Sequence, residues 1–377
     1  MRIGIDARML GPACGGLGRY VEQLVIHLEK SGTSHQVVLF MRSENWESFV
    51  PSTKNVHKVL VDIPWYSVRE QIYFSRYIHQ AQVDVMHWPH WNVPIGYTGP
   101  LVLTVHDLIM FHYPREEAST HGRLVYRVKD QVARLVLRQA VKKAKKIIVT
   151  SEFTREDVHT SLGVAREKMM VTYQAPFEVI HNTVTITNQS VGLPDIRKPF
   201  VLYVGNMFPH KNIDGLLKAW QVFVHRYGSE YQLVLAGPKN FFSEQIRQQV
   251  LCEQIPNVVM LGFVNDEQLA ILYGQARLYV FPSLYEGFGI PPLEAMSHGV
   301  PVVSSNRSCL PEILGEAALY VDPENIEQMA DAIYRGLTDE SIRYELISRG
   351  REELQRYSWD ILAKKTLAIY ESISLKT

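Results

Sequence analysis

Two glutamates on either side of a glycine turn are the residues whose types and spacing indicate chemistry in this sequence. Seven residues separate Glu286 from Glu294, and the turn Gly287-Phe288-Gly289 directly follows the first of them. Carboxylates accept hydrogen bonds from the vicinal hydroxyls of a ribose or a hexose. Glycines let the main chain turn sharply and bring its N–H groups close to a ligand. Together these residues favour a ligand that carries both hydroxyl and phosphate groups.

The turn is predicted to connect a strand to a helix. The apolar run from Leu278 to Phe281 is typical of a buried strand, and Pro291 and Pro292 suit the first turn of a helix. The positive N-terminal end of that helix also favours phosphate. Taken singly, either glutamate would be an ordinary acidic residue stabilised by the helix dipole. The pair, with the glycines between them, favours a ligand site.

Length and composition predict two domains and exclude a general attraction to nucleic acid. The chain has 377 residues, more than one hydrophobic core usually organises, and its 39 Lys and Arg balance its 39 Asp and Glu. The three cysteines are widely spaced and follow no metal-ligand pattern, so we expect reduced thiols. Strand-like residues directly follow Met1, and no apolar run approaches ~18 residues. We therefore expect a cytoplasmic protein that is neither secreted nor integral to a membrane.

Both halves of the chain alternate apolar strands with amphipathic helices. This alternation predicts βαβ units around parallel sheets, an α/β fold of two doubly wound domains. Periodicity is lost from about Glu178 to Lys198, which we interpret as the interdomain crossing. Strands are predicted at residues 2–6, 37–40, 83–86, 101–105 and 146–150 in the first half, and at 200–204, 232–236, 257–260, 278–281 and 300–303 in the second.

Three further places could contribute to a site. His106 directly follows the strand 101–105, so it is expected at the carboxyl end of a parallel strand, where α/β sheets bind ligands. Lys211 precedes a predicted helix at 213–224, whose dipole would help it to attract a diphosphate. The glycines that follow the first strand, from Gly11 to Gly18, lack the G-x-G-x-x-G fingerprint. An NAD-dependent enzyme is therefore disfavoured.

Aromatic side chains gather at the predicted strand ends. Trp65-Tyr66 and the run His87-Trp88-Pro89-His90-Trp91 could stack on an acceptor sugar or pack in the core. Both interpretations stay open.

A basic segment runs from Arg123 to Lys146. It holds nine Lys and Arg against a single acid, Asp130, and its apolar residues recur at helical spacing. Such a helix could lie on an anionic membrane surface, or pack on the core with a solvated basic face.

With these motifs the chain resembles the retaining glycosyltransferases of family 4, whose mark is two glutamates with seven residues between them in a Glu-Gly-Phe-Gly turn. The resemblance spans essentially the whole chain. It implies the GT-B fold, in which two Rossmann-like domains face each other across a cleft. Residues 1–185 would form the acceptor-side domain and 186–356 the donor-side domain, with a helix at 357–377 crossing back to the first.

The resemblance also implies a role for each matching residue. Glu294 would hold the ribose of a nucleotide-sugar donor, and Glu286 would address the transferred sugar together with His106, which would lie near the reacting carbon. His106, Glu286 and Lys211 are the candidate catalytic residues. The other predicted donor contacts are Asn206 after the strand 200–204, Gly15 and Gly16 in a loop facing the diphosphate, the N–H groups of Gly287, Phe288 and Gly289, and Gly262 and Phe263 near the base.

One departure from the family pattern concerns the diphosphate. Many members carry an arginine where this chain has Asn206, which puts donor affinity or leaving-group stabilisation in question; His210 is a candidate to compensate. The sequence contains no D-x-D triplet, the metal-binding motif of the other large glycosyltransferase architecture. We therefore expect no metal and no cofactor besides the donor.

The donor is inferred only by analogy. The His-Lys-Asn turn at residues 210–212 resembles that of mannosyltransferases, so we expect GDP-mannose. A carbohydrate or lipid-linked saccharide is the expected acceptor, in polysaccharide or lipopolysaccharide biosynthesis. Peripheral contact with the inner face of a membrane is an open alternative to a purely cytoplasmic location. Three alternatives stay open: a donor such as UDP-glucose, a nucleotide-sugar binding protein without turnover, and a phosphorylase-like enzyme with pyridoxal phosphate.

Overall fold

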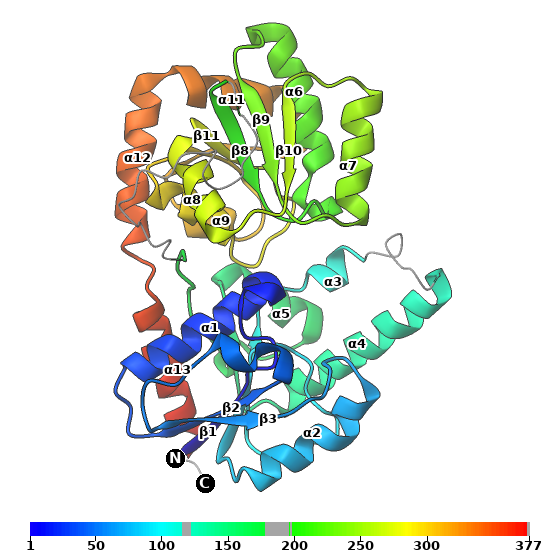
Figure 1. Ribbon diagram of the computed structural model, residues 1–377, viewed down its shortest axis with the longest axis vertical. Helices are drawn as coiled ribbons and strands as arrows, with labels where there is room; N and C mark the ends of the chain where they lie inside the picture. Colours follow the sequence, from blue (N-terminus) through cyan, green and yellow to red (C-terminus); the bar gives the residue numbers. More distant parts are fainter. Residues whose placement is uncertain (115–121, 178–195, 197, 375–377) are drawn as a thin grey trace. The chain divides into compact units, whose positions relative to one another are not determined.

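A computed structural model describes residues 1–114, 122–177, 196 and 198–374, and its internal contacts divide the chain into two compact units (Figure 1). The first unit combines Met1–Gln174 with Ser358–Thr377, and the second is Ala175–Tyr357. Most of the interdomain segment predicted at residues 178–198, including the predicted boundary between 185 and 186, lies outside the described residues.

The first unit is built on a parallel sheet that has helices on both faces. Within the described residues its strand order is β3-β2-β1-β4-β5-β6-β7. The strands are β1 (Arg2–Asp6), β2 (Gln36–Met41), β3 (Val56–Leu60), β4 (Val85–Trp88), β5 (Leu101–Val105), β6 (Lys146–Val149) and β7 (Met169–Val171), and the helices are α1 (Gly15–Lys30), α2 (Val68–Gln80), α3 (Ile109–His112), α4 (Arg123–Lys143), α5 (Glu152–Leu162) and α13 (Trp359–Ser374).

Helix α13 completes the first unit, although it comes late in the chain. It packs along α1, and the two helices lie side by side in Figure 1. The His27 ring pairs with Asp360 at 2.7 Å. The Tyr370 hydroxyl contacts Nδ1 of His87, in the middle of the sheet, at 2.6 Å. The core of this unit therefore depends on residues that follow the whole second unit in the sequence.

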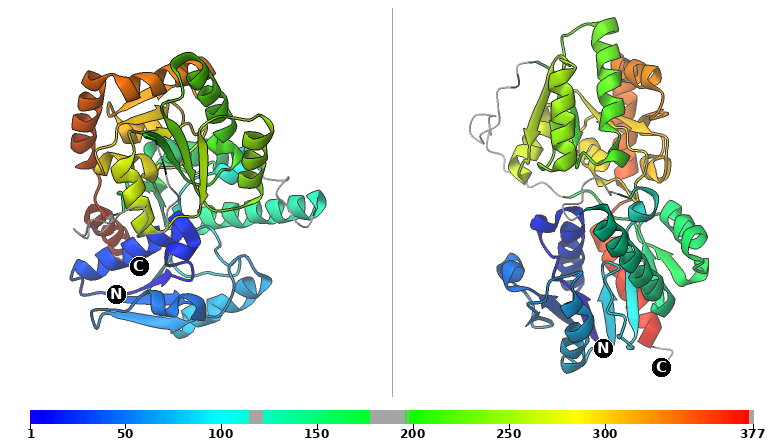
Figure 2. Two further views of the ribbon diagram at one scale, coloured as in Figure 1. Left: turned by 45° about the horizontal axis from the view of Figure 1, so that its top comes forward. Right: turned by 90° about the vertical axis from the view of Figure 1, so that its right-hand side faces the viewer.

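The second unit repeats the doubly wound pattern (Figure 2). Its strand order within the described residues is β10-β9-β8-β11-β12-β13, so the order reverses between β8 and β11, where such sheets bind ligands. The strands are β8 (Phe200–Val204), β9 (Gln232–Ala236), β10 (Val258–Gly262), β11 (Leu278–Phe281), β12 (Val302–Ser305) and β13 (Ala318–Val321), and the helices are α6 (Ile213–Tyr227), α7 (Phe241–Cys252), α8 (Asp266–Gln275), α9 (Ile290–Ser297), α10 (Leu310–Leu314), α11 (Ile326–Thr338) and α12 (Glu340–Leu354).

The predicted α/β architecture is confirmed in each unit, with three local corrections. Helix α1 begins at Gly15, so Gly15 and Gly16 form its first turn and not a loop before it. The basic segment is not one helix, because α4 ends at Lys143 and Lys146 begins β6. Strand β4 extends to Trp88, which is fully buried together with His87. The interpretation that these two rings pack in the core is therefore the right one.

None of the helices that the structure describes is both long enough and apolar enough to cross a membrane.

Candidate functional site

The glycine turn of the second unit lies between β11 and α9, as predicted. All four residues of β11 are buried, and proline occupies the first turn of α9. Gly289 directly precedes the helix with a φ of 89°, and a Cβ at this position would come within 2.9 Å of Leu310. A left-handed backbone and close packing thus both require glycine here. Phe288 is buried edge-on against Tyr357, so this residue can offer a ligand only its main chain.

Glu286 and Lys211 form an ion pair at this turn. Their Oε1 and Nζ atoms are 2.5 Å apart, and both side chains are largely buried. The pairing follows from the sheet, because β8 and β11 are neighbours and the N–H of Leu284 donates to the carbonyl of His210 at 2.7 Å. The N–H of Glu286 also donates to the hydroxyl of Ser308 at 3.0 Å. Sequence reasoning identified the glutamate and the lysine, but neither their contact nor the role of Ser308.

Glu294 is held by a tyrosine that sequence reasoning missed. Its side chain is 5% exposed, and Oε2 accepts a hydrogen bond from the hydroxyl of Tyr273 at 2.9 Å. Tyr273 is fully buried in α8 and stacks on the ring of His298 at 5.3 Å. The hydrogen bond from the Tyr273 hydroxyl therefore fixes the orientation of this buried carboxyl group. Only the packing of α8 beside α9 reveals this contact.

Asn206 lies in a tight turn after β8. The Tyr203 hydroxyl donates to its main-chain oxygen at 2.7 Å. A Cβ on Gly237 would lie 2.0 Å from the oxygen of Gly205, so the turns after β8 and β9 touch through their backbones. His210 is buried beside Phe208, at 5.9 Å between ring centroids, and so is not placed to supply an exposed charge in place of the missing arginine.

The predicted base position is at the edge of the same sheet. Gly262 ends β10 with a φ of 75°, and the Phe263 side chain that follows is 74% exposed. An exposed aromatic ring at the carboxyl end of a parallel strand is free to stack on a flat ligand.

In the first unit, His106 directly follows β5, as predicted. Its Nε2 is 2.9 Å from the carbonyl oxygen of Pro89, which can only accept, so this nitrogen carries the proton. Nδ1 then accepts from the amide of Gln174 at 3.3 Å. Burial lowers the pKa of His106 to about 4, and the ring is therefore neutral at neutral pH.

A pocket of about 490 Å³ opens beside His106. Its aromatic wall combines Tyr66 and Trp91, whose rings are 5.1 Å apart, with His90, whose Nδ1 is 2.9 Å from the Tyr66 hydroxyl. Of the aromatic rings that could contact a sugar, Tyr66, His90 and Trp91 line this pocket. His87 and Trp88 are instead buried in the core. The other lining residues are Asp107, Ile109, Met110, Tyr113, Tyr126, Lys129, Asp130 and Ala133.

A buried charge cluster fixes the aromatic wall. Arg8 is almost completely buried and pairs with both Asp6, at 2.7 Å, and Glu70. Glu70 also accepts from the amide of Asn92 at 2.6 Å and from the N–H of Tyr66 at 2.8 Å. Tyr66 has a φ of 58°, which is unusual for a residue with a side chain. The cluster therefore holds Tyr66 in a strained conformation that aims its ring at the pocket.

The glycines at the start of α1 leave space. A Cβ on Gly15 or Gly16 would meet no atom within 4 Å, whereas one on Gly18 would lie 2.0 Å from the oxygen of Gly11. Gly18 is therefore required for packing, whereas Gly15 and Gly16 leave the start of the helix open.

Among the described residues, no group of three or more His, Cys, Asp or Glu side chains is arranged to hold a metal ion. Metal independence stays a prediction.

Comparisons with known proteins agree on one family. The family model described as Glycosyltransferase Family 4 matches residues 14–175, and the one described as Glycosyl transferases group 1 matches residues 187–353. The O-antigen chain mannosyltransferase B of Escherichia coli is 32% identical over 76% of this chain and 74% of its own length. The O-antigen chain mannosyltransferase RfbU of Salmonella typhimurium is 32% identical over 62% of each chain.

Solved structures show the same fold. Sucrose-phosphate synthase from Thermosynechococcus elongatus superposes with a TM-score of 0.76 over the full length of both chains, at 22% sequence identity. The expected GT-B fold is thereby confirmed.

Proposed function

The chain belongs to glycosyltransferase family 4, and on this premise we propose that it transfers mannose from GDP-mannose to a saccharide acceptor with retention of configuration. The observation that carries the proposal is the arrangement of Lys211, Glu286 and Glu294 around one glycine turn, at the reversal of strand order in the second unit. The names of the two O-antigen mannosyltransferases support mannose as the sugar.

The donor's diphosphate is assigned to Lys211. Without a donor, the ammonium group pairs with Glu286, so donor binding exchanges one anionic partner of the lysine for another and releases the Glu286 carboxylate to accept hydrogen bonds from the sugar. The start of α9 adds main-chain N–H groups and the positive end of its dipole. Because Asn206 replaces an arginine, Lys211 is the principal side-chain cation in this assignment, and it stabilises the departing diphosphate as its charge grows.

The remaining contacts follow from hydrogen-bonding capacity. Glu286 and Glu294 offer carboxylate oxygens to the hydroxyls of the sugar and the ribose respectively. His106 is neutral at neutral pH, so in this proposal it contacts the sugar without acting as a general acid. The acceptor's proton passes instead to the leaving phosphate on the same face, which gives retention without a protein nucleophile and without a metal.

The acceptor is assigned to the aromatic pocket of the first unit. Tyr66 and Trp91 present ring faces that stack on the apolar face of a pyranose, and Asp107 and Asp130 line the same pocket with groups that bond to hydroxyls.

Helix α4 supports a lipid-linked acceptor at a membrane surface. Val125, Val128, Val132 and Leu135 are between 42% and 58% exposed, and their spacings of three or four residues place them on one stripe. The residues that pack inward come later in the helix, from Val136 to Val141. A basic helix that leaves an apolar stripe in solvent fits contact with anionic lipid better than a solvated basic face. We therefore propose a cytoplasmic protein held peripherally at the inner face of the membrane.

A panel of nucleotide sugars tests the proposal. Purified protein is incubated with GDP-mannose, UDP-glucose and related donors, and release of the nucleoside diphosphate is measured with and without saccharide acceptors. We expect turnover of GDP-mannose that an acceptor accelerates, with no loss in EDTA. Preferential turnover of UDP-glucose would replace the donor assignment while keeping the family chemistry. Binding of a donor that then stays intact with every acceptor would indicate a binding protein.

A further inference from the structure

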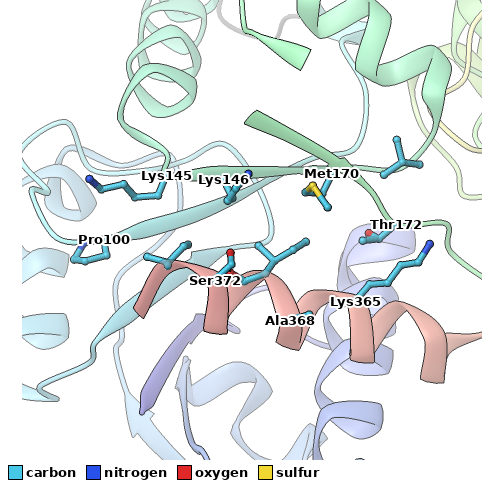
Figure 3. Close-up of a pocket in the computed structure, with 11 residues that line it drawn as sticks. Pro100, Lys145, Lys146, Met170, Thr172, Lys365, Ala368 and Ser372 are labelled. Atoms are coloured by element: carbon cyan, nitrogen blue, oxygen red, sulfur yellow. The ribbon is translucent and has the colours of Figure 1, made fainter. Parts of the chain in front are cut away.

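A groove of about 540 Å³ runs between strand β7 and helix α13 of the first unit (Figure 3). It shares no lining residue with the pocket beside His106. The order of the described strands explains it, because β7 is the edge strand whereas α13 packs mainly against β4 and β6. The lining residues are Pro100, Lys145, Lys146, Met170, Val171, Thr172, Lys365, Ala368, Ile369, Ser372 and Ile373.

The middle of the groove is apolar. Met170, on the edge strand, is 43% exposed, and Ala368 faces it from α13 and is also exposed. Ile369 and Ile373 form the adjoining wall with only a small exposed fraction. Exposing a concave apolar surface of this size to water is unfavourable in free energy. An apolar ligand of matching shape would bury that surface.

The ends of the groove are cationic. Lys145 extends toward Pro100 at one end, Lys146 lies between Lys145 and Met170, and Lys365 lies near Thr172 at the other end (Figure 3). Among these described lining residues there is no Asp or Glu to neutralise the three lysines, and the contact that the Lys146 ammonium makes with the main-chain oxygen of Glu167, at 3.1 Å, leaves its charge in place. The Thr172 side chain is buried, and its hydroxyl has no hydrogen-bond partner among the described residues. The groove thus combines an apolar middle with excess positive charge.

We propose that this groove binds the single apolar chain of a phosphate-bearing lipid, with the phosphate on Lys145 and Lys146. Residues 365–373 of α13 run along it, a length of about 12 Å at 1.5 Å per residue, which suits a chain of moderate length. Its volume is within the usual range for small-molecule sites, roughly 300 to 1,000 Å³. A saccharide is a poorer fit, because the lining offers no aromatic face and few hydroxyl partners. Two adjacent lysines suit the charge of a phosphate monoester.

Calorimetric titration of the whole protein with decyl phosphate, below its micelle concentration, tests the site. Inorganic phosphate carries the charge without the chain, and decyl maltoside carries the chain without the charge. We expect one decyl phosphate to bind per protein chain, and both comparison ligands to bind at least tenfold more weakly. Equal binding of the neutral detergent, or no binding of decyl phosphate, would overturn the proposal.

Three variants locate the site. Ala368→Trp fills the groove and should weaken decyl phosphate binding more than tenfold. Lys145→Gln with Lys146→Gln should weaken it about thirtyfold, because each cation near such a phosphate contributes about a fivefold factor. Met170→Glu, at an exposed position, places a carboxylate in the groove without adding bulk and should also weaken decyl phosphate binding. It replaces the tryptophan variant as the test if that variant does not fold. Lys142→Gln with Lys364→Gln is the matched control, since both lysines are exposed and neither lines the groove.

The groove and the proposed transfer reaction are tested separately. Ala368→Trp should leave donor hydrolysis unchanged, because Ala368 touches none of the residues assigned to donor or acceptor. Wild-type affinity for decyl phosphate in a folded Ala368→Trp variant would show that the lipid binds elsewhere and would refute the groove assignment.

Discussion

Glu294 is the residue whose contacts most constrain the proposed donor site. It is nearly buried, and its carboxylate depends on the hydroxyl of Tyr273 for orientation. A carboxylate that accepts hydrogen bonds from ribose hydroxyls contributes roughly 1.5 to 3 kcal/mol. The ribose does not change during transfer, so this contribution should be nearly equal in the ground state and the transition state.

We therefore predict that Glu294→Ala lowers kcat/KM for the donor by about tenfold to a few hundredfold, mostly through a raised KM. Tyr273→Phe keeps the carboxylate but removes its neutral donor, and should lower kcat/KM about three- to tenfold. Steady-state kinetics with varied donor measures both. Circular dichroism must show that each variant is folded, since both residues lie in helices. Wild-type kinetics in a folded Glu294→Ala variant would show that Glu294 does not contact the donor.

Lys211 should behave differently, because the diphosphate that we assign to it would change its charge during the proposed reaction. The diphosphate becomes more negative as the sugar departs, so an ammonium beside it stabilises the transition state more than the ground state. We predict that Lys211→Ala lowers kcat itself, by up to ~10² to 10³.

A matched comparison separates this effect from the general consequence of removing a paired lysine. Lys218 pairs with Asp214 on an exposed face of α6, and Lys218→Ala should leave kcat unchanged. If Lys211→Ala changed only the KM for the donor, the lysine would bind the ground state and the transition state equally. It would then not stabilise the leaving group.

At the scale of elements, α4 is where sequence and structure differ most usefully. Its apolar residues predicted a helix, but their helical spacing fits a core face and a lipid-facing stripe equally well. The structure separates the two, because Val128 and Val132 are exposed whereas Leu137 and Ala140 are buried. Burial depends on which neighbours the fold supplies, and periodicity within one helix does not contain that information.

We predict that the protein co-sediments with vesicles containing anionic lipid and not with neutral vesicles, and that salt weakens the association. Val128→Asp with Val132→Asp should abolish it without unfolding, because both side chains are already in solvent. Lys54→Glu with Lys364→Glu changes two exposed charges outside α4 and should have a smaller effect. Equal recovery with both vesicle types would refute the membrane assignment.

The individual strands and helices also show how much of the site could be predicted from the sequence. Strands β1, β5, β8, β9 and β11 have the predicted bounds, since long apolar runs between turn residues are a strong local signal. The glycine turn and His106 followed from their places at strand ends. The contacts of Tyr273, Ser308 and Gln174 could not be predicted, because each joins residues from separate elements. The start of α1 at Gly15 could not be predicted either, because glycine is a poor helix former and only the packing of α1 fixes that turn.

At the scale of the whole molecule, buried histidines link stability to pH. His87 lies between the Tyr370 hydroxyl, at 2.6 Å, and the Thr104 hydroxyl, at 2.8 Å, and burial lowers its pKa to about 3. The unfolded chain binds a proton at this residue near pH 6.5, whereas the folded chain does not. The free energy of unfolding should therefore fall as pH drops below about 6.5 and level off near pH 3.

We predict a loss on the order of 1 kcal/mol per pH unit from His87 alone in that window. Urea unfolding at pH 7.5, 6 and 5 measures it. His87→Gln removes the titrating group while keeping polar atoms for both hydroxyls, and its stability should depend less steeply on pH. An unchanged slope in this variant would show that His87 does not contribute.

The position of α13 has a consequence for how the protein is made. Tyr370 and its neighbours close the core of the first unit, yet they leave the ribosome only after residues 175–357 have been synthesised. The second unit is contiguous and can fold as it emerges, whereas the nascent first unit must wait with the surface that receives α13 uncovered. The N-terminal part of the chain is therefore the part most exposed to chaperones and to aggregation during translation, and a premature stop anywhere in the second unit would leave it permanently unfinished.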